Sequence, residues 1–91
     1  ELKKAEIDLD YAYQRSLEAI KADRDRSEVD KSSRRKNLNE AQKAWVAYKV
    51  TQCNGVVADQ WAGGSGLAQA VLSCELRHAR MRTKELENGS R

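Results

Sequence analysis

Apolar residues recur along the chain with helical spacing in three successive segments. In the first segment they fall three or four residues apart, at Leu2, Ala5, Leu9, Tyr13, Leu17 and Ile20. This spacing places them on one face of an α-helix, which we expect over about residues 2–28. Ser32 and Ser33 are the best candidates for the break that follows, because either side chain can cap the next helix.

Two further apolar stripes predict two more helices. They indicate a helix over about residues 33–61 and another over about residues 67–88. The first stripe comprises Leu38, Ala41, Trp45, Tyr48, Cys53, Val56 and Val57, and the second Leu67, Val71, Cys74, His78, Met81 and either Glu85 or Leu86. Gly55 lies inside the first of these helices, where it is either a tolerated helical glycine or a mark of a kink or close packing.

Three helices joined by short loops predict an all-α, up-down-up bundle. The chain of 91 residues has no proline and 34% charged residues. Both features favour helices, and the length favours one small domain over residues 1–91. Because the helices are long for the chain, we expect an elongated bundle. Its core is expected to hold the aromatic residues Tyr13, Trp45 and Tyr48, with Leu9, Leu17, Leu38, Val71, Met81 and Leu86.

The two cysteines, Cys53 and Cys74, lie on either side of the glycine-rich run Gly63-Gly64-Ser65-Gly66. If the helices before and after this run fold back on each other, each cysteine lies roughly 12–16 Å from the turn, at 1.5 Å rise per residue. The two sulfur atoms are then at similar heights, where a disulfide can form. A disulfide between these helices indicates an oxidising compartment.

The sequence gives little support for a catalytic, metal or phosphate-binding site. A catalytic cysteine needs a nearby histidine, and His78 lies one turn beyond Cys74, but the second cysteine is available to consume the thiol. Two cysteines and one histidine without CxxC-type spacing do not complete a zinc shell. The carboxylates form no acid–base pair, and the glycine run lacks the phosphate-loop pattern. We therefore expect no enzyme activity, no catalytic residue, no metal and no cofactor.

The net charge of +3 is unevenly distributed. Residues 1–30 carry nine acidic and six basic side chains, whereas residues 31–61 carry six basic and two acidic ones. Basic groups also gather at residues 34–36 and, on one face of the third helix, at Arg77, Arg80 and Lys84. These groups form either a solvated face or a surface for anions, and the weak net charge argues against nucleic acid. No apolar run approaches the roughly 20 residues that a membrane helix needs.

Residues 42–53 read as QxxWxxY[RK]xxxC, which resembles the signature of the lysozyme inhibitor LprI-like domain of secreted bacterial proteins. The flanking elements LD-x-x-Y and GGS…C…R…L resemble those of the same family, and the resemblance covers about residues 5–88. The matching residues are Leu9, Tyr13, Gln42, Trp45, Tyr48, Cys53, Cys74, Arg82 and Leu86. The chain lacks the additional cysteine pair of many members, and Asp10 and Lys49 replace the usual Asn and Arg.

The resemblance implies a helical, disulfide-linked domain in the bacterial periplasm or outside the cell. The chain has no signal-peptide pattern, so we expect it to be a mature or trimmed form, although a cytosolic fragment has the same appearance. The resemblance also implies a protein partner, either a lysozyme or another cell-wall hydrolase. The alternatives are a structural module of the cell envelope and a domain that binds anions or nucleic acid.

Three residues are candidates for contact with a partner. Trp61 lies beside the glycine run, where a small bundle tapers, and an exposed tryptophan there would suit a protein interface. Asp8 and Asp10 belong to the acidic first segment. Animal lysozymes are strongly basic, so charge complementarity favours this segment as the part that meets them. The sequence does not indicate the oligomeric state.

Overall fold

The computed structural model describes residues 1–89 as a set of helices with no β-strand. The long helices are α1 (Leu2–Ala22), α2 (Glu28–Thr51) and α4 (Leu67–Gly89). Between α2 and α4 lie the π-helical turn η1 (Gln52–Val57) and the short helix α3 (Ala58–Gln60). We expected one domain over residues 1–91, and the last two positions of that range lie outside the described residues.

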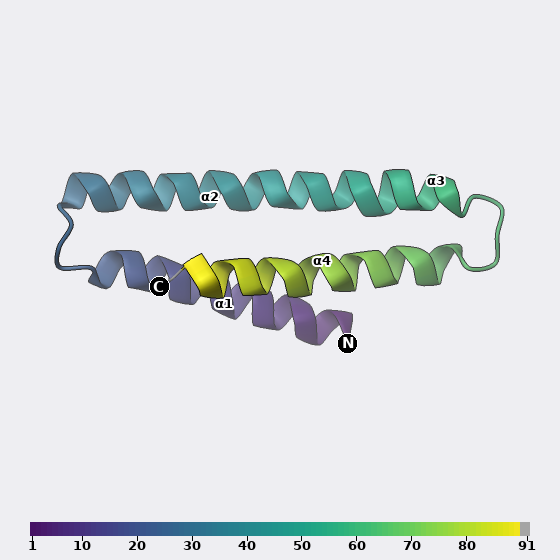
Figure 1. Ribbon diagram of the computed structural model, residues 1–91, viewed down its shortest axis with the longest axis horizontal. Helices are drawn as coiled ribbons and strands as arrows, with labels where there is room; N and C mark the ends of the chain where they lie inside the picture. Colours follow the sequence, from purple (N-terminus) through teal and green to yellow (C-terminus); the bar gives the residue numbers. More distant parts are fainter. Residues whose placement is uncertain (90–91) are drawn as a thin grey trace.

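The helices form an elongated up-down-up bundle (Figure 1). α2, η1 and α3 follow one another as a single long rod, and α1 and α4 lie along the same side of it, both running opposite to α2. The molecule measures 54 × 21 × 15 Å. The predicted all-α, elongated three-helix fold with one disulfide between helices is therefore confirmed.

The core lies mainly between α1 and α4 and is built from small residues. Ala5 and Ala12 of α1 and Ala79 of α4 are buried, and they pack with Leu9 and Leu86. Alanine side chains let two helices approach closely, because no bulky group holds their axes apart. The second helix α2 contributes only partly buried side chains to this core, among them Leu38 and Trp45.

A buried serine secures the same contact. The Ser16 hydroxyl lies 3.0 Å from the Ala12 carbonyl oxygen and 3.4 Å from the Leu86 carbonyl oxygen, so it can donate to either. Ser16 is 7% exposed, and a buried hydroxyl without an acceptor would be costly. The interaction with Leu86 ties the C-terminal part of α4 to α1.

Two residues expected in the core lie at the surface. Tyr48 is 58% exposed and Met81 is 55% exposed. Met81 follows the buried Ala79 by two positions, which rotates it about 200° around α4, away from α1. Tyr48 finds no space in a core made of alanines, and its ring instead contacts the His78 ring edge-on, with 5.6 Å between centroids. Of the other expected core residues, Leu9 and Leu86 are buried, and Tyr13, Leu17, Leu38, Trp45 and Val71 are partly buried.

The first interhelical turn lies earlier than expected. α1 ends at Ala22 instead of near residue 28, and Ser32 and Ser33 lie inside α2. The helix cap is Ser27, whose hydroxyl oxygen accepts a hydrogen bond of 3.1 Å from the Asp30 backbone N–H. Glu28 and Asp30 in the first turn of α2 add favourable interactions with the helix dipole. Residues 23–28, which we expected in the first helix, therefore form the turn and the start of α2.

Asp23 organises this turn. Its carboxylate accepts a hydrogen bond from the Asp25 backbone N–H at 3.0 Å and forms an ion pair with Arg34 of α2 at 3.1 Å. The Asp25 amide, followed by Arg34, holds the pKa of Asp23 below its usual value. A lowered folded-state pKa means that the interaction stabilises the fold above the ordinary carboxyl pKa, and that this contribution is lost as pH falls through the lowered value.

Trp45 is the largest side chain that packs on the core. We expect Trp45→Ala to lower the free energy of unfolding by about 2–3 kcal/mol, less than for a fully buried tryptophan because this ring is partly exposed. Tyr48→Ala is the matched control and should cost less than about 1 kcal/mol, since Tyr48 is exposed. Urea unfolding monitored by circular dichroism measures both values, and equal losses for the two variants would contradict this description of the core.

Candidate protein-binding site at the disulfide-linked end

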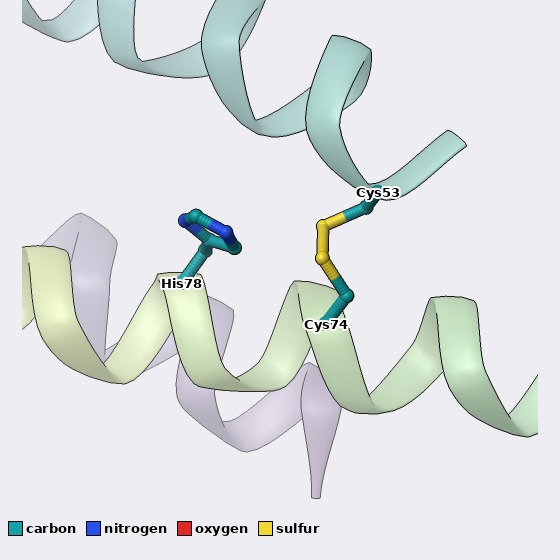
Figure 2. A group of neighbouring side chains, drawn as sticks. All are labelled: Cys53, Cys74 and His78. Atoms are coloured by element: carbon teal, nitrogen blue, oxygen red, sulfur yellow. A yellow bond between two sulfur atoms is a disulfide. The ribbon is translucent and has the colours of Figure 1, made fainter. Parts of the chain in front are cut away.

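A disulfide joins the two arms of the helical hairpin that is formed by η1 and α4. The Cys53 and Cys74 sulfur atoms are bonded, and the two Cα atoms are 5.5 Å apart. Both residues are almost completely buried, with exposed fractions of 0% and 1%. Figure 2 shows the bond crossing directly between the two elements. The disulfide expected from the sequence is therefore present, and it fixes the register of the hairpin near its turn.

Cys53 lies in a π-helical turn, which the sequence analysis did not anticipate. η1 spans Gln52–Val57 and contains Gly55. A Cβ atom built on Gly55 would meet nothing within 4 Å, so no close neighbour requires a glycine there. A π-turn accommodates one extra residue in a helix. The sequence does contain a signal for this turn, because Tyr48 and Cys53 are five positions apart in a stripe whose other spacings are mostly three or four.

His78 is the polar neighbour of the disulfide. A ring nitrogen of His78 and the two sulfur atoms lie within 4.8 Å of one another, and Figure 2 shows Cys74 and His78 pointing from α4 toward the same partner helix. The sulfur atoms are bonded to each other, so in this state neither is a thiolate that can act as a nucleophile or a zinc ligand. The cluster is therefore a structural link, and His78 packs against Tyr48.

Beyond the disulfide, glycines shape the turn between α3 and α4 around Trp61. Gly63 has a φ of 79°, a backbone conformation that favours glycine. The Gly64 backbone N–H donates to the Trp61 carbonyl oxygen at 2.9 Å. A Cβ atom on Gly66 would lie 2.7 Å from the Trp61 ring, so only glycine lets that ring lie so close to the backbone. The Trp61 ring is thus held on one side while its residue remains 48% exposed.

Two residues of the family motifs, Gln42 of α2 and Arg82 of α4, join these helices by a hydrogen bond. The Arg82 Nε donates to the Gln42 side-chain oxygen at 3.0 Å, and its Nη1 lies 3.3 Å from the Glu85 carboxylate. Only 14% of the Arg82 side chain is exposed. The Lys49 ammonium lies over the Trp45 ring at 5.3 Å, a cation–π contact. This pairing could not be identified from the sequence, because Gln42 is 40 residues away from Arg82 along the chain.

The acidic candidates lie elsewhere in the molecule. Asp8 and Asp10 are exposed residues of α1, which packs beside the C-terminal half of α4, away from the α3–α4 turn (Figure 1). Asp8 also forms an exposed ion pair with Lys4 at 3.8 Å. The structure thus does not bring Trp61 together with Asp8 and Asp10. In the described part of the chain, no helix is both long and apolar enough to cross a membrane.

Removal of the disulfide should weaken the fold substantially. We expect the double variant Cys53→Ala/Cys74→Ala to lose about 3 kcal/mol of unfolding free energy, because the bridge closes a loop of 21 residues. Urea unfolding under oxidising conditions measures the loss. Addition of a reductant should weaken the native protein and leave the double variant unchanged. If the oxidised native protein and the variant unfold at the same urea concentration, the disulfide does not have this role.

Comparison with known proteins places this helical hairpin in a family. The family model described as lysozyme inhibitor LprI matches residues 1–86, which is nearly the whole chain. No curated protein sequence and no solved structure matches the chain. The matched region contains the disulfide, the Trp61 turn and the Gln42–Arg82 contact described above. The chain therefore belongs to the lysozyme inhibitor LprI family.

Proposed function

We propose that this protein is a binding module of the lysozyme-inhibitor type, whose partner is a lysozyme or a related cell-wall hydrolase. The observation that carries the proposal is the family match over residues 1–86. The buried disulfide supports a role in an oxidising compartment, such as the periplasm or the outside of the cell, because such bonds persist there. The protein acts by binding, as the family description is that of an inhibitor and not of an enzyme.

The α3–α4 turn is the part of the molecule best suited to enter a partner's cleft. It lies at one narrow end of a rod whose two shorter dimensions are 21 and 15 Å (Figure 1). Trp61 projects there with 48% of its surface exposed, and tryptophan is among the residues that contribute most at protein interfaces. The disulfide behind the turn limits its motion, which lowers the entropy lost on binding. We place the inhibitory contact at Trp61 and the glycine run.

The acidic face of α1 has a different role in this proposal. Asp8 and Asp10 are exposed and lie apart from the turn. Charged groups at the edge of an interface mainly change the rate of association and its salt dependence. For a basic lysozyme, these carboxylates would attract the enzyme, while Trp61 would set the lifetime of the complex.

The experiment is an inhibition and binding assay of the oxidised protein against a panel of c-type, g-type and bacterial lysozymes. We expect saturable inhibition of at least one enzyme at micromolar concentration or below. Trp61→Ala should weaken binding by at least about tenfold through faster dissociation, as about 1.4 kcal/mol corresponds to a factor of ten. Asp8→Asn/Asp10→Asn should slow association a few-fold at low salt, with little change in dissociation.

Tyr48→Ala is the matched control for the tryptophan variant, since it also removes an exposed aromatic ring but from the side of α2. It should leave the affinity within about twofold. Circular dichroism and thermal unfolding verify that each variant is folded. If none of the enzymes binds, the proposed partner class is wrong. If an enzyme binds and Trp61→Ala matches the control, the partner class stands and the placement at the turn is wrong.

A further inference from the structure

The exposed side of α4 carries a row of cations, and at one edge of this row Arg80 and Lys84 line a hollow together with residues of α1. Arg77, Arg80 and Lys84 are all exposed and occupy positions i, i+3 and i+7 of the helix. Residues at this spacing share one side of a helix. The row extends over roughly 10 Å at 1.5 Å per residue. The opposite side of α4 carries the buried Ala79 and Leu86, which face α1. We call the row, together with Leu76 and Met81, the cationic face.

Apolar groups lie among these cations. A shallow hollow of about 250 Å³ is lined by Leu76 and Met81 together with Ser73 and the three basic residues. Met81 is 55% exposed, and Leu76 is partly buried because it also packs on the core. The cationic face therefore offers a binding partner positive charge from the three basic side chains and apolar surface from Met81. Basic side chains beside apolar ones are also a feature of helices that bind at the surface of an anionic bilayer.

The cations are available to an external anion. Arg77 and Lys84 form no ion pair among those found in residues 1–89. Arg80 lies 3.5 Å from the Glu1 carboxylate, but the two side chains are 58% and 80% exposed. Such a surface ion pair contributes little free energy, so a phosphate can replace the carboxylate at small cost.

We propose that the cationic face docks on an anionic phospholipid surface. Arg77, Arg80 and Lys84 would contact headgroup phosphates, and Met81 would enter the boundary between headgroups and acyl chains. The three cations extend over a greater length than one phosphate group. They therefore match a continuous anionic surface better than a single phosphate ion. The apolar hollow favours lipid over single-stranded nucleic acid, for which aromatic stacking residues would be expected beside the cations. This inference goes beyond the proposed function and does not depend on it.

The test is co-sedimentation of the oxidised protein with vesicles of phosphatidylglycerol and phosphatidylcholine, and with vesicles of phosphatidylcholine alone. Binding should require phosphatidylglycerol and should weaken as salt is raised. Each basic residue near an anionic surface contributes about a fivefold increase in partitioning. Arg77→Gln/Lys84→Gln should therefore lower the partition coefficient about 25-fold. Met81→Ser should lower it a few-fold at every salt concentration, because its contribution is apolar.

The matched control is Lys36→Gln/Lys43→Gln, which removes two exposed cations from α2 and so changes the net charge equally. It should change partitioning less than about twofold. Equal losses in the two double variants would show diffuse attraction and overturn the proposal. Equal binding to both kinds of vesicle, or no vesicle binding with strong retention on heparin, would overturn it as well. Both double variants alter exposed residues, so their melting temperatures should match that of the native protein.

Discussion

The Cys53–Cys74 bond is the interaction on which the rest of the structure depends. The core between α1 and α4 is built from alanines and a few leucines, and α1 covers only the C-terminal half of α4. Beyond the end of α1, the hairpin of η1, α3 and α4 has little apolar surface to bury, and its fully buried side chains are the two cysteines. A covalent link compensates there for the small core, as disulfides do in many small secreted domains.

This arrangement divides the rod into two parts that are stabilised by different interactions. In the part around α1, burial of small residues, the Ser16 hydroxyl and the Gln42–Arg82 hydrogen bond hold three helices together. In the other part, the disulfide fixes a two-helix hairpin that ends in a glycine-rich turn. The absence of a side chain at Gly66 lets the Trp61 ring pack closely on the backbone, and the residue remains 48% exposed. The disulfide and the backbone conformation of the glycine-rich turn therefore limit motion at this end of the rod. Exposed side chains such as Trp61 are not needed for that purpose.

The three-helix fold and the disulfide could be predicted from the sequence, because helical periodicity and the cysteine spacing are local signals. The positions of α4 and the disulfide follow from them directly. The exposure of Tyr48 and Met81 could not be predicted in the same way, because both lie near apolar stripes and only the close packing of alanines decides which side chains are admitted. The first turn was misplaced because Ser32 and Ser33 offered a cap as good as Ser27, and the ion pair of Asp23 with Arg34 that stabilises the true turn is a tertiary contact. The acidic and aromatic candidates for binding were identified individually, but their separation along the rod required the fold.

Hydrogen–deuterium exchange of the oxidised protein, free and bound to an inhibited lysozyme, tests most directly whether the disulfide-linked end is the binding end. The account predicts that the strongest new protection falls on residues 58–67, which form α3, the following turn and the first residue of α4. The backbone around Ser16 and Leu86 should keep the same exchange rates in both states. Protection that is confined to residues outside 58–67, such as the turn at residues 23–27, would contradict the account.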